Sequence, residues 1–187
     1  MPVWQEFYQK YVGFALEVLS VAIDCQGVDL VRPFVEAAQT TFVTLIDQEN
    51  LLSTAFGFKA VPNCLLVDES GLLVYKQFGG FDIRKSESAR LLKGWVITGQ
   101  LPGETYGPEI MQVDSNHRRS SLRFSEGLEL YKDGRIEDAR GKWREAVAME
   151  PDNYVVRKQI WAIENPDKFY SGEVDYEWQR SQIEKGL

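Results

Sequence analysis

Few side chains in this sequence could carry out covalent chemistry: two cysteines, Cys25 and Cys64, and one histidine, His117. A cysteine thiolate can attack a disulfide or bind a metal ion, and a histidine can transfer protons near neutral pH. An all-cysteine zinc site needs four thiolates, so neither such a site nor a cluster of histidines can form from this sequence. It also lacks a phosphate-binding loop, a dinucleotide-binding fingerprint and a Ser-His-Asp set. We therefore expect no metal and no cofactor.

His117 is followed by Arg118 and Arg119 in a polar stretch without an apolar period. Such a histidine is most simply a solvated loop residue, and this is our expectation for His117. Arg118, Arg119 and Arg123 together form a small basic group. Basic side chains at the start of a helix commonly form surface ion pairs, which we expect here in preference to an anion site.

Six small, turn-forming and aromatic residues in the C-terminal third of the sequence follow one another at spacings of 7, 5, 4, 3 and 5. They are Gly127, Gly134, Ala139, Trp143, Ala146 and Pro151. Gly127 and Ala139 would let two antiparallel helices approach closely, Trp143 would fill the groove between them, and Pro151 would end the second helix. The pattern resembles a single tetratricopeptide repeat (TPR) of about 34 residues, with an atypical first helix that carries Arg123 and Glu126.

One such repeat cannot bury a continuous core by itself, so it must lean on another surface. We expect the helices of residues 118–187 to brace the preceding domain. The alternative is a groove that binds a protein partner. That alternative predicts an exposed apolar groove near Trp143.

The elements before residue 100 alternate between helix and strand. Trp4, Phe7, Tyr8 and Tyr11 lie on one helical face that ends near Gly13, and the apolar runs at 16–23 and 42–46 predict a mostly buried strand and a short strand. We expect helices to follow Asp29 and Asp47, a hairpin of strands 64–67 and 72–75, and a helix at 85–98. This order predicts an α/β domain over residues 1–100, followed by a linker at 101–117 and the helical region at 118–187.

The segment from Val3 to Gly80 resembles the thioredoxin superfamily, and within it the TlpA/ResA-type (redoxin) thiol–disulfide oxidoreductases. The matching stretches are residues 18–24, 31–34, 45–47, 55–57, 61–62 and 66–68, with Gly71 and Val74. The resemblance implies a thioredoxin-like sheet. It also implies that Pro62 is the cis-proline that faces the catalytic dithiol and positions the substrate.

The C-x-x-C motif on which that family's chemistry depends is missing. The first residues, Met1 to Trp4, resemble the stretch that follows the motif, so the chain lacks both redox cysteines and the central strand before them. Three explanations stay open: a true start further upstream, which we favour; direct closure of the two flanking strands; or a strand supplied by a second chain. The last would give a homodimer through the exposed sheet edge.

Cys25 and Cys64 could replace the missing dithiol only if the sheet brought them together. With a central strand between theirs, they would lie about 10 Å apart, which is twice the spacing of neighbouring strands. That exceeds the limit of roughly 7 Å between the Cα atoms of a disulfide. Because free cysteines are among the most buried residues, we expect two inert thiols, with a redox pair as the alternative.

The chain has 187 residues and a formal net charge of −7, without a basic stripe. Phosphate and anionic lipid surfaces require clustered Lys and Arg, so we expect neither nucleic acid nor membrane as a partner. No secretory signal is recognisable, which predicts a cytoplasmic protein as the sequence stands, or an extracytoplasmic one if the true start lies upstream.

We expect a redoxin-like protein without redox activity, whose partners would be a protein or a thiol/disulfide substrate. The alternative is a non-catalytic interaction module that acts through the TPR-like helices.

Overall fold

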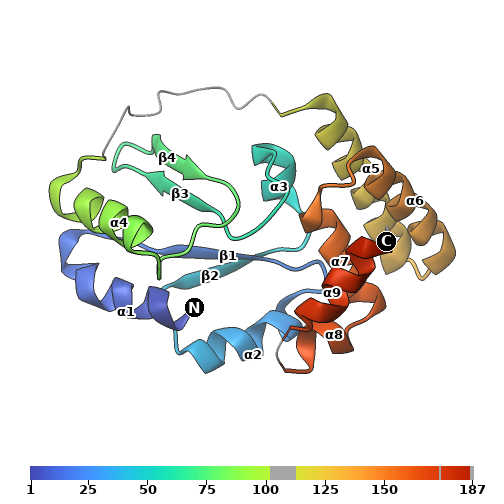
Figure 1. Cartoon of the computed structure of the whole chain (residues 1–187), viewed down its shortest axis with the longest axis horizontal. Helices are drawn as coiled ribbons and strands as arrows, with labels where there is room; N and C mark the ends of the chain where they lie inside the picture. The colour runs from blue at the N-terminus through green and yellow to red at the C-terminus, as the bar shows by residue number, and fades with distance from the viewer. Residues whose placement is uncertain (102–112, 173, 186–187) are drawn as a thin grey trace.

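The computed structural model describes residues 1–101, 113–172 and 174–185. An α/β part contains the four strands, surrounded by α1, α2 and α4, and a helical part formed by α5 to α9 lies beside it (Figure 1). Most of the predicted linker, residues 102–112, falls outside the described residues. The helical part begins with α5 (Ser115–Lys132), three residues before the predicted boundary.

The described strands form two separate pairs. β1 (Leu19–Ile23) lies parallel to β2 (Val43–Asp47), and the two are connected by α2 (Val28–Ala38). β3 (Cys64–Val67) lies antiparallel to β4 (Leu73–Gln77). In the described part of the chain no ladder joins β1 to β3, so the strands expected to flank a missing central strand do not share a sheet and have not closed up. Among residues 1–101, 113–172 and 174–185, each pair keeps backbone edges without a neighbouring strand.

A small apolar core holds α1 (Pro2–Tyr11) and α4 (Ser86–Thr98) against the hairpin. Its buried members are Cys64, Leu66, Phe81, Ile83 and Leu92, with Trp4 and Phe7 of α1 packed on them. The Trp4 ring stacks on Phe81 at 6.1 Å between centroids. The helical period of Trp4, Phe7 and Tyr11 therefore predicted the buried face of α1 correctly, while a short 3₁₀ turn (Val12–Phe14) ends it.

The connecting segments show how local chemistry sets element boundaries. Both carboxylate oxygens of Asp47 accept hydrogen bonds of 2.8 Å from the first backbone N–H groups of α3 (Leu51–Phe56), so a helix does follow Asp47 as expected, and Asp47 caps it. Gly57, with φ of +73°, ends the helix. Asp29 does not cap α2; Gly27 occupies that position and Asp29 lies in the first turn.

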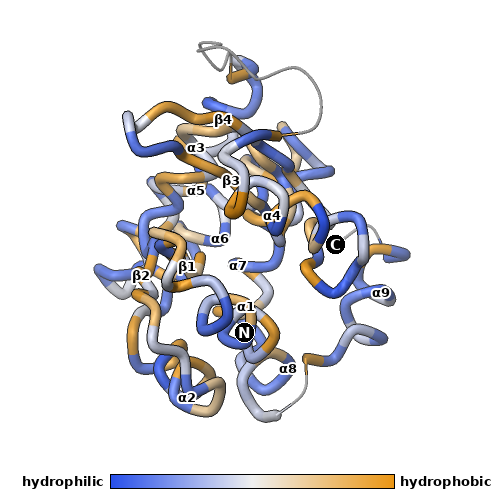
Figure 2. Tube along the Cα trace, turned by 90° about the vertical axis from the view of Figure 1, so that its left-hand side faces the viewer, coloured by the Kyte–Doolittle hydropathy of each residue, from blue (hydrophilic) through white to orange (hydrophobic). Residues whose placement is uncertain are grey.

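The helical part is built on an antiparallel pair, α5 and α6 (Ile136–Met149), joined by a turn at Gly134 with φ of +77°. α7 (Tyr154–Glu164) packs onto the pair. The shared core consists of Phe124, Leu128, Ala139, Trp143, Ala146, Val156 and Ile160. A short α8 (Asp167–Tyr170) and α9 (Tyr176–Glu184) complete the chain, with Trp161 against Trp178 at 5.8 Å. The backbone is hydrophobic along β3 and largely hydrophilic along α9, in keeping with their buried and peripheral places (Figure 2).

Candidate functional site

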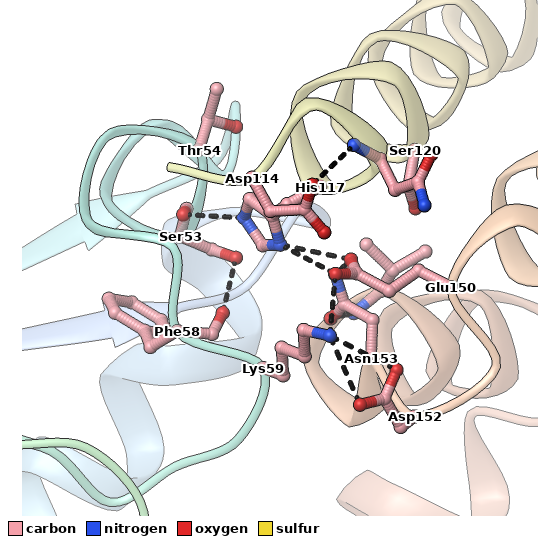
Figure 3. Close-up of polar contacts among 12 residues, drawn as sticks. Ser53, Thr54, Phe58, Lys59, Asp114, His117, Ser120, Glu150, Asp152 and Asn153 are labelled. Carbon is pink, nitrogen blue, oxygen red and sulfur yellow. Dashed lines mark hydrogen bonds and ion pairs between the residues drawn. The ribbon is translucent and has the colours of Figure 1, made fainter. Parts of the chain in front are cut away.

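The most concentrated group of buried polar side chains lies where the α/β part meets the helical part (Figure 3). His117, in the first turn of α5, is 1% exposed. Its Nδ1 lies 2.9 Å from Glu150 Oε2, and its Nε2 lies 2.8 Å from the backbone carbonyl oxygen of Ser53 in α3. The imidazole thus joins a carboxylate of the helical part to the main chain of the α/β part.

Glu150 is the centre of this group. It directly follows α6, and only 3% of the residue is exposed. Besides the imidazole, its carboxylate binds Lys59 Nζ at 2.9 Å and accepts a hydrogen bond of 2.8 Å from the Asn153 amide. A buried carboxylate is tolerated when it is paired and hydrogen-bonded in this way.

Lys59 connects the buried group to solvent. Its ammonium bridges Glu150 and Asp152, and the two carboxylate oxygens of Asp152 lie 3.1 and 3.2 Å from it. The Lys59 side chain is 36% exposed. The hydrogen bond to Glu150 is the main cause that raises the pKa of Lys59 above its ordinary value. Its backbone carbonyl also accepts a bond of 3.1 Å from Val155 N–H, so α7 begins on the same segment.

These contacts do not suit His117 to act as a general base. A base needs a free lone pair that points at a reacting group, and both ring nitrogens here face acceptors. The hydroxyl of Ser53 donates to the Phe58 carbonyl at 2.8 Å and is not aligned with the imidazole. The cluster is therefore a buried polar connection between the two parts, in which a histidine and a carboxylate lie together without an activated nucleophile.

A second connection lies at the carboxyl end of β1. The side-chain amide of Gln159 in α7 donates to the Ile23 carbonyl at 2.8 Å and accepts from Cys25 N–H at 2.9 Å. The Tyr170 hydroxyl donates to Asp24 at 2.8 Å, and burial is the largest cause that raises the pKa of Tyr170. The helical part thus binds the end of the strand through polar groups.

The structure separates the two cysteines. Cys25 packs against the helical core, Cys64 is buried in the core under the hairpin, and both thiols are free. Burial raises the pKa of Cys64 to about 12. Burial, and then the charge of Asp24, raise the pKa of Cys25 further. Neither thiol has the electropositive, accessible setting that makes a thiolate nucleophile.

Pro62 lies in the exposed segment that leads into β3. The Val61–Pro62 peptide bond is cis, the form that the resemblance implies, and the Pro62 carbonyl accepts a bond of 3.3 Å from Phe81 N–H. Both residues of this bond are exposed to solvent. A role in positioning a substrate remains a proposal.

The TPR-like residues occupy the α5–α6 pair. A Cβ atom at Gly127 would overlap the indole of Trp143, whose Nε1–H donates to the Phe124 carbonyl at 3.3 Å. Ala139 and Ala146 are fully buried, Gly134 makes the turn, and Pro151 follows the end of α6. Trp143 is 2% exposed, so its indole is not available to line the apolar groove that the interaction-module alternative predicts. An open depression of about 300 Å³ on this pair is lined mainly by charged residues: Glu126, Glu129, Leu130, Asp133 and Lys142.

The prediction for His117 was wrong. It lies in α5 and not in a loop, and it is among the largest fully buried side chains. Glu150, Lys59 and Gln159 were missed, because nothing in a sequence joins a histidine to a carboxylate 33 positions away. One signal was available: Glu150 and Asn153 flank Pro151 between two helices, where polar side chains commonly satisfy helix ends.

Within the described ranges, no group of His, Cys, Asp and Glu side chains could hold a metal ion. Over the same ranges, no helix combines the length and apolar character needed to cross a membrane. Comparison with known proteins finds no matching family model, no matching curated protein and no matching solved structure.

Proposed function

We propose that this chain is a thioredoxin-like protein related to the TlpA/ResA-type oxidoreductases. We propose further that it does not catalyse thiol–disulfide exchange and that its TPR-like helices brace the α/β part. The observation that carries the proposal is the state of the two thiols. Cys64 is buried under the hairpin, the partly buried Cys25 packs against the separate helical core, and each thiol has a raised pKa. Exchange begins with attack by a thiolate, and a second nearby thiol must then resolve the mixed disulfide.

The brace role is supported by the contacts between the two parts. The helical part meets α3 through His117 and meets the end of β1 through Gln159 and Tyr170. The Trp143 side chain of the helical part is buried in the core between α5 and α6. These observations favour a structural role for the repeat over a peptide-binding one.

The test is disulfide reduction by the whole chain. We expect reduction of insulin disulfides at the rate of the Cys25→Ala/Cys64→Ala double variant, which serves as the matched control. Alkylation by iodoacetamide at pH 8 should be slow for both cysteines in the native protein and fast in denaturant, since the pKa of each thiol is raised far enough that it is almost wholly protonated at pH 8. Turnover above the double variant would overturn the proposal.

A second function, self-association through the β1–β2 sheet, is favoured by one face of that sheet. The parallel register pairs Leu19 with Val43 and Val21 with Leu45, so these four apolar side chains share a face. Leu19, Val43 and Leu45 are 60%, 59% and 49% exposed. Apolar faces left open in this way often mark protein interaction sites.

Light scattering after size-exclusion chromatography distinguishes a monomer from a dimer. If the face mediates pairing, the protein should elute as a dimer at micromolar concentration, and Leu45→Lys should convert it to a monomer. Leu122→Lys is the matched control, because Leu122 is similarly exposed, at 57%, but lies on α5. A wild-type monomer at all concentrations would exclude this second function.

A further inference from the structure

We infer that His117 is a proton-dependent latch between the α/β part and the helical part, closed when both ring nitrogens carry a proton and released at α3 when one proton is lost. The inference rests on the hydrogen-bond geometry of His117 and does not depend on the proposed function. It identifies a pH-sensitive contact inside a chain that has a single histidine.

The two contacts of the ring bear on its protonation state, because both partners offer acceptor oxygens. A neutral imidazole has one N–H donor and one lone pair, whereas the imidazolium has two donors. Both partners of His117 are acceptors: the Glu150 carboxylate at 2.9 Å and the Ser53 carbonyl at 2.8 Å. Only the imidazolium satisfies both contacts while Glu150 remains ionised. Ser53 O also accepts from Gly57 N–H at 2.8 Å, so it is fixed by the last turn of α3.

The charges around the ring come from every element packed on it. Glu150 faces it from the end of α6, Lys59 reaches Glu150 from the segment after α3, and Asp152 pairs with Lys59 from the turn before α7. Asp114 caps α5 itself, one turn before His117, where Arg118 and Arg119 are exposed neighbours. With His117 protonated, the imidazolium and Lys59 balance Glu150 and Asp152. Loss of that proton removes one of the two positive charges that contact the buried Glu150 carboxylate.

When the ring loses one proton, we expect its contact with Glu150 to remain and its contact with the Ser53 carbonyl to be lost. A ring that keeps its proton on Nδ1 still donates to Glu150, and this bond stays within the helical part. The Nε2 lone pair then faces the Ser53 carbonyl oxygen, and two acceptors at that distance repel each other. The expected consequence is that the end of α3 separates from α5, while the α5–α6 pair stays intact.

The single histidine makes this testable on the intact chain. The ring of His117, labelled with ¹⁵N, should show two protonated nitrogens at pH 6 and one at high pH. Hydrogen-exchange protection, corrected for the intrinsic pH dependence, should fall at Gly57 N–H about tenfold or more between pH 6 and pH 9, since hydrogen bonds that involve a charged group are at least that strong. Ala139 and Ala146 in α6 should keep their protection.

The variant His117→Gln provides the control, because glutamine is neutral throughout this range. Its protection at Gly57 should be low and independent of pH. A pH-dependent loss that persists in His117→Gln would overturn the inference, and so would an equal loss in α6. If this variant fails to fold, the labelled wild-type ring decides alone. A neutral ring at pH 6, with the proton on Glu150, or unchanged protection at Gly57 across its titration would equally reject the latch.

Discussion

At the scale of single residues, the most constrained side chain is Glu150. Its carboxylate takes hydrogen bonds from His117 and Asn153 and an ion pair from Lys59, and almost none of it reaches solvent. Removal of one member of a buried ionic group leaves the others uncompensated, which costs more than the group itself contributes. The effect of a substitution here should therefore far exceed that of a surface charge.

We expect Glu150→Gln to lower the free energy of unfolding by about 3 kcal/mol, because His117 and Lys59 lose their anion in a buried setting. Urea unfolding followed by tryptophan fluorescence measures this loss. The matched control is Asp152→Asn, which removes the other, 66% exposed, carboxylate that contacts Lys59. The control should cost below about 1 kcal/mol, and equal losses in both variants would contradict this account.

Sequence reasoning could identify the cysteines and Pro62 by type, but not the partners of His117. The basic residues beside it suggested solvent exposure, although Arg118 and Arg119 point to the outside of the same helix whose inner face carries His117. An isolated polar residue gives no periodic signal, because periodicity is read from apolar side chains. Its burial depends on a carboxylate and a carbonyl from two other elements.

At the scale of elements, the packing of α5 against α6 depends on the close contact between Gly127 and Trp143. Gly127 lies where any Cβ would overlap Trp143, so the indole fills the space that a side chain would take. This is why a glycine is tolerated in the middle of an 18-residue helix despite its unfavourable backbone entropy.

Gly127→Ala should therefore destabilise the protein by about 1–3 kcal/mol, the usual range for overpacking in a core. Gly141→Ala is the matched control in the partner helix, because a Cβ there meets nothing within 4 Å. It should raise stability by about 0.5–1 kcal/mol, since alanine is the better helix former. Thermal unfolding by circular dichroism reports both changes, and a neutral Gly127→Ala would show that the helices do not pack through this contact.

Most elements were predictable from the sequence, and their pairing was not. The apolar period located α1 and α4, the spacing of small and aromatic residues located the α5–α6 pair, and α3 was correctly expected to follow Asp47. Strand partners depend on long-range backbone contacts that no local pattern records. The sequence pattern consequently supports the β3–β4 hairpin, whose strands are neighbours, but not the separation of β1 from β3.

At the scale of the whole molecule, the helical part is held by polar contacts with the main chain of the α/β part. They are the bonds of His117 to Ser53, Gln159 to Ile23 and Cys25, and Val155 to Lys59, with a surface pair between Lys132 and Glu49. The repeat was expected to lean on the α/β domain. Which surface it would use could not be foreseen, because several of the contacts involve backbone atoms, which are the same at every residue.

We expect both parts to unfold in one transition, and Gln159→Leu to weaken it. This change leaves the Ile23 carbonyl and the Cys25 N–H without the amide, so the free energy of unfolding should fall by about 2 kcal/mol. Gln182→Leu is the control, since it removes a bond to the adjacent Ser181 on α9 and should cost below about 0.5 kcal/mol. Two separate transitions in urea would contradict the expected coupling of the parts.

The amide of Gln159 has a consequence for how this protein can change over time. A carboxamide presents the same donor and acceptor as a peptide unit, so it recognises positions 23 and 25 without regard to what side chains they carry. Substitution of the side chains at those two positions therefore does not remove these hydrogen bonds, whereas substitution of Gln159 does. At this contact, the side-chain identity is therefore constrained in the helical part, at Gln159, and not in the α/β part.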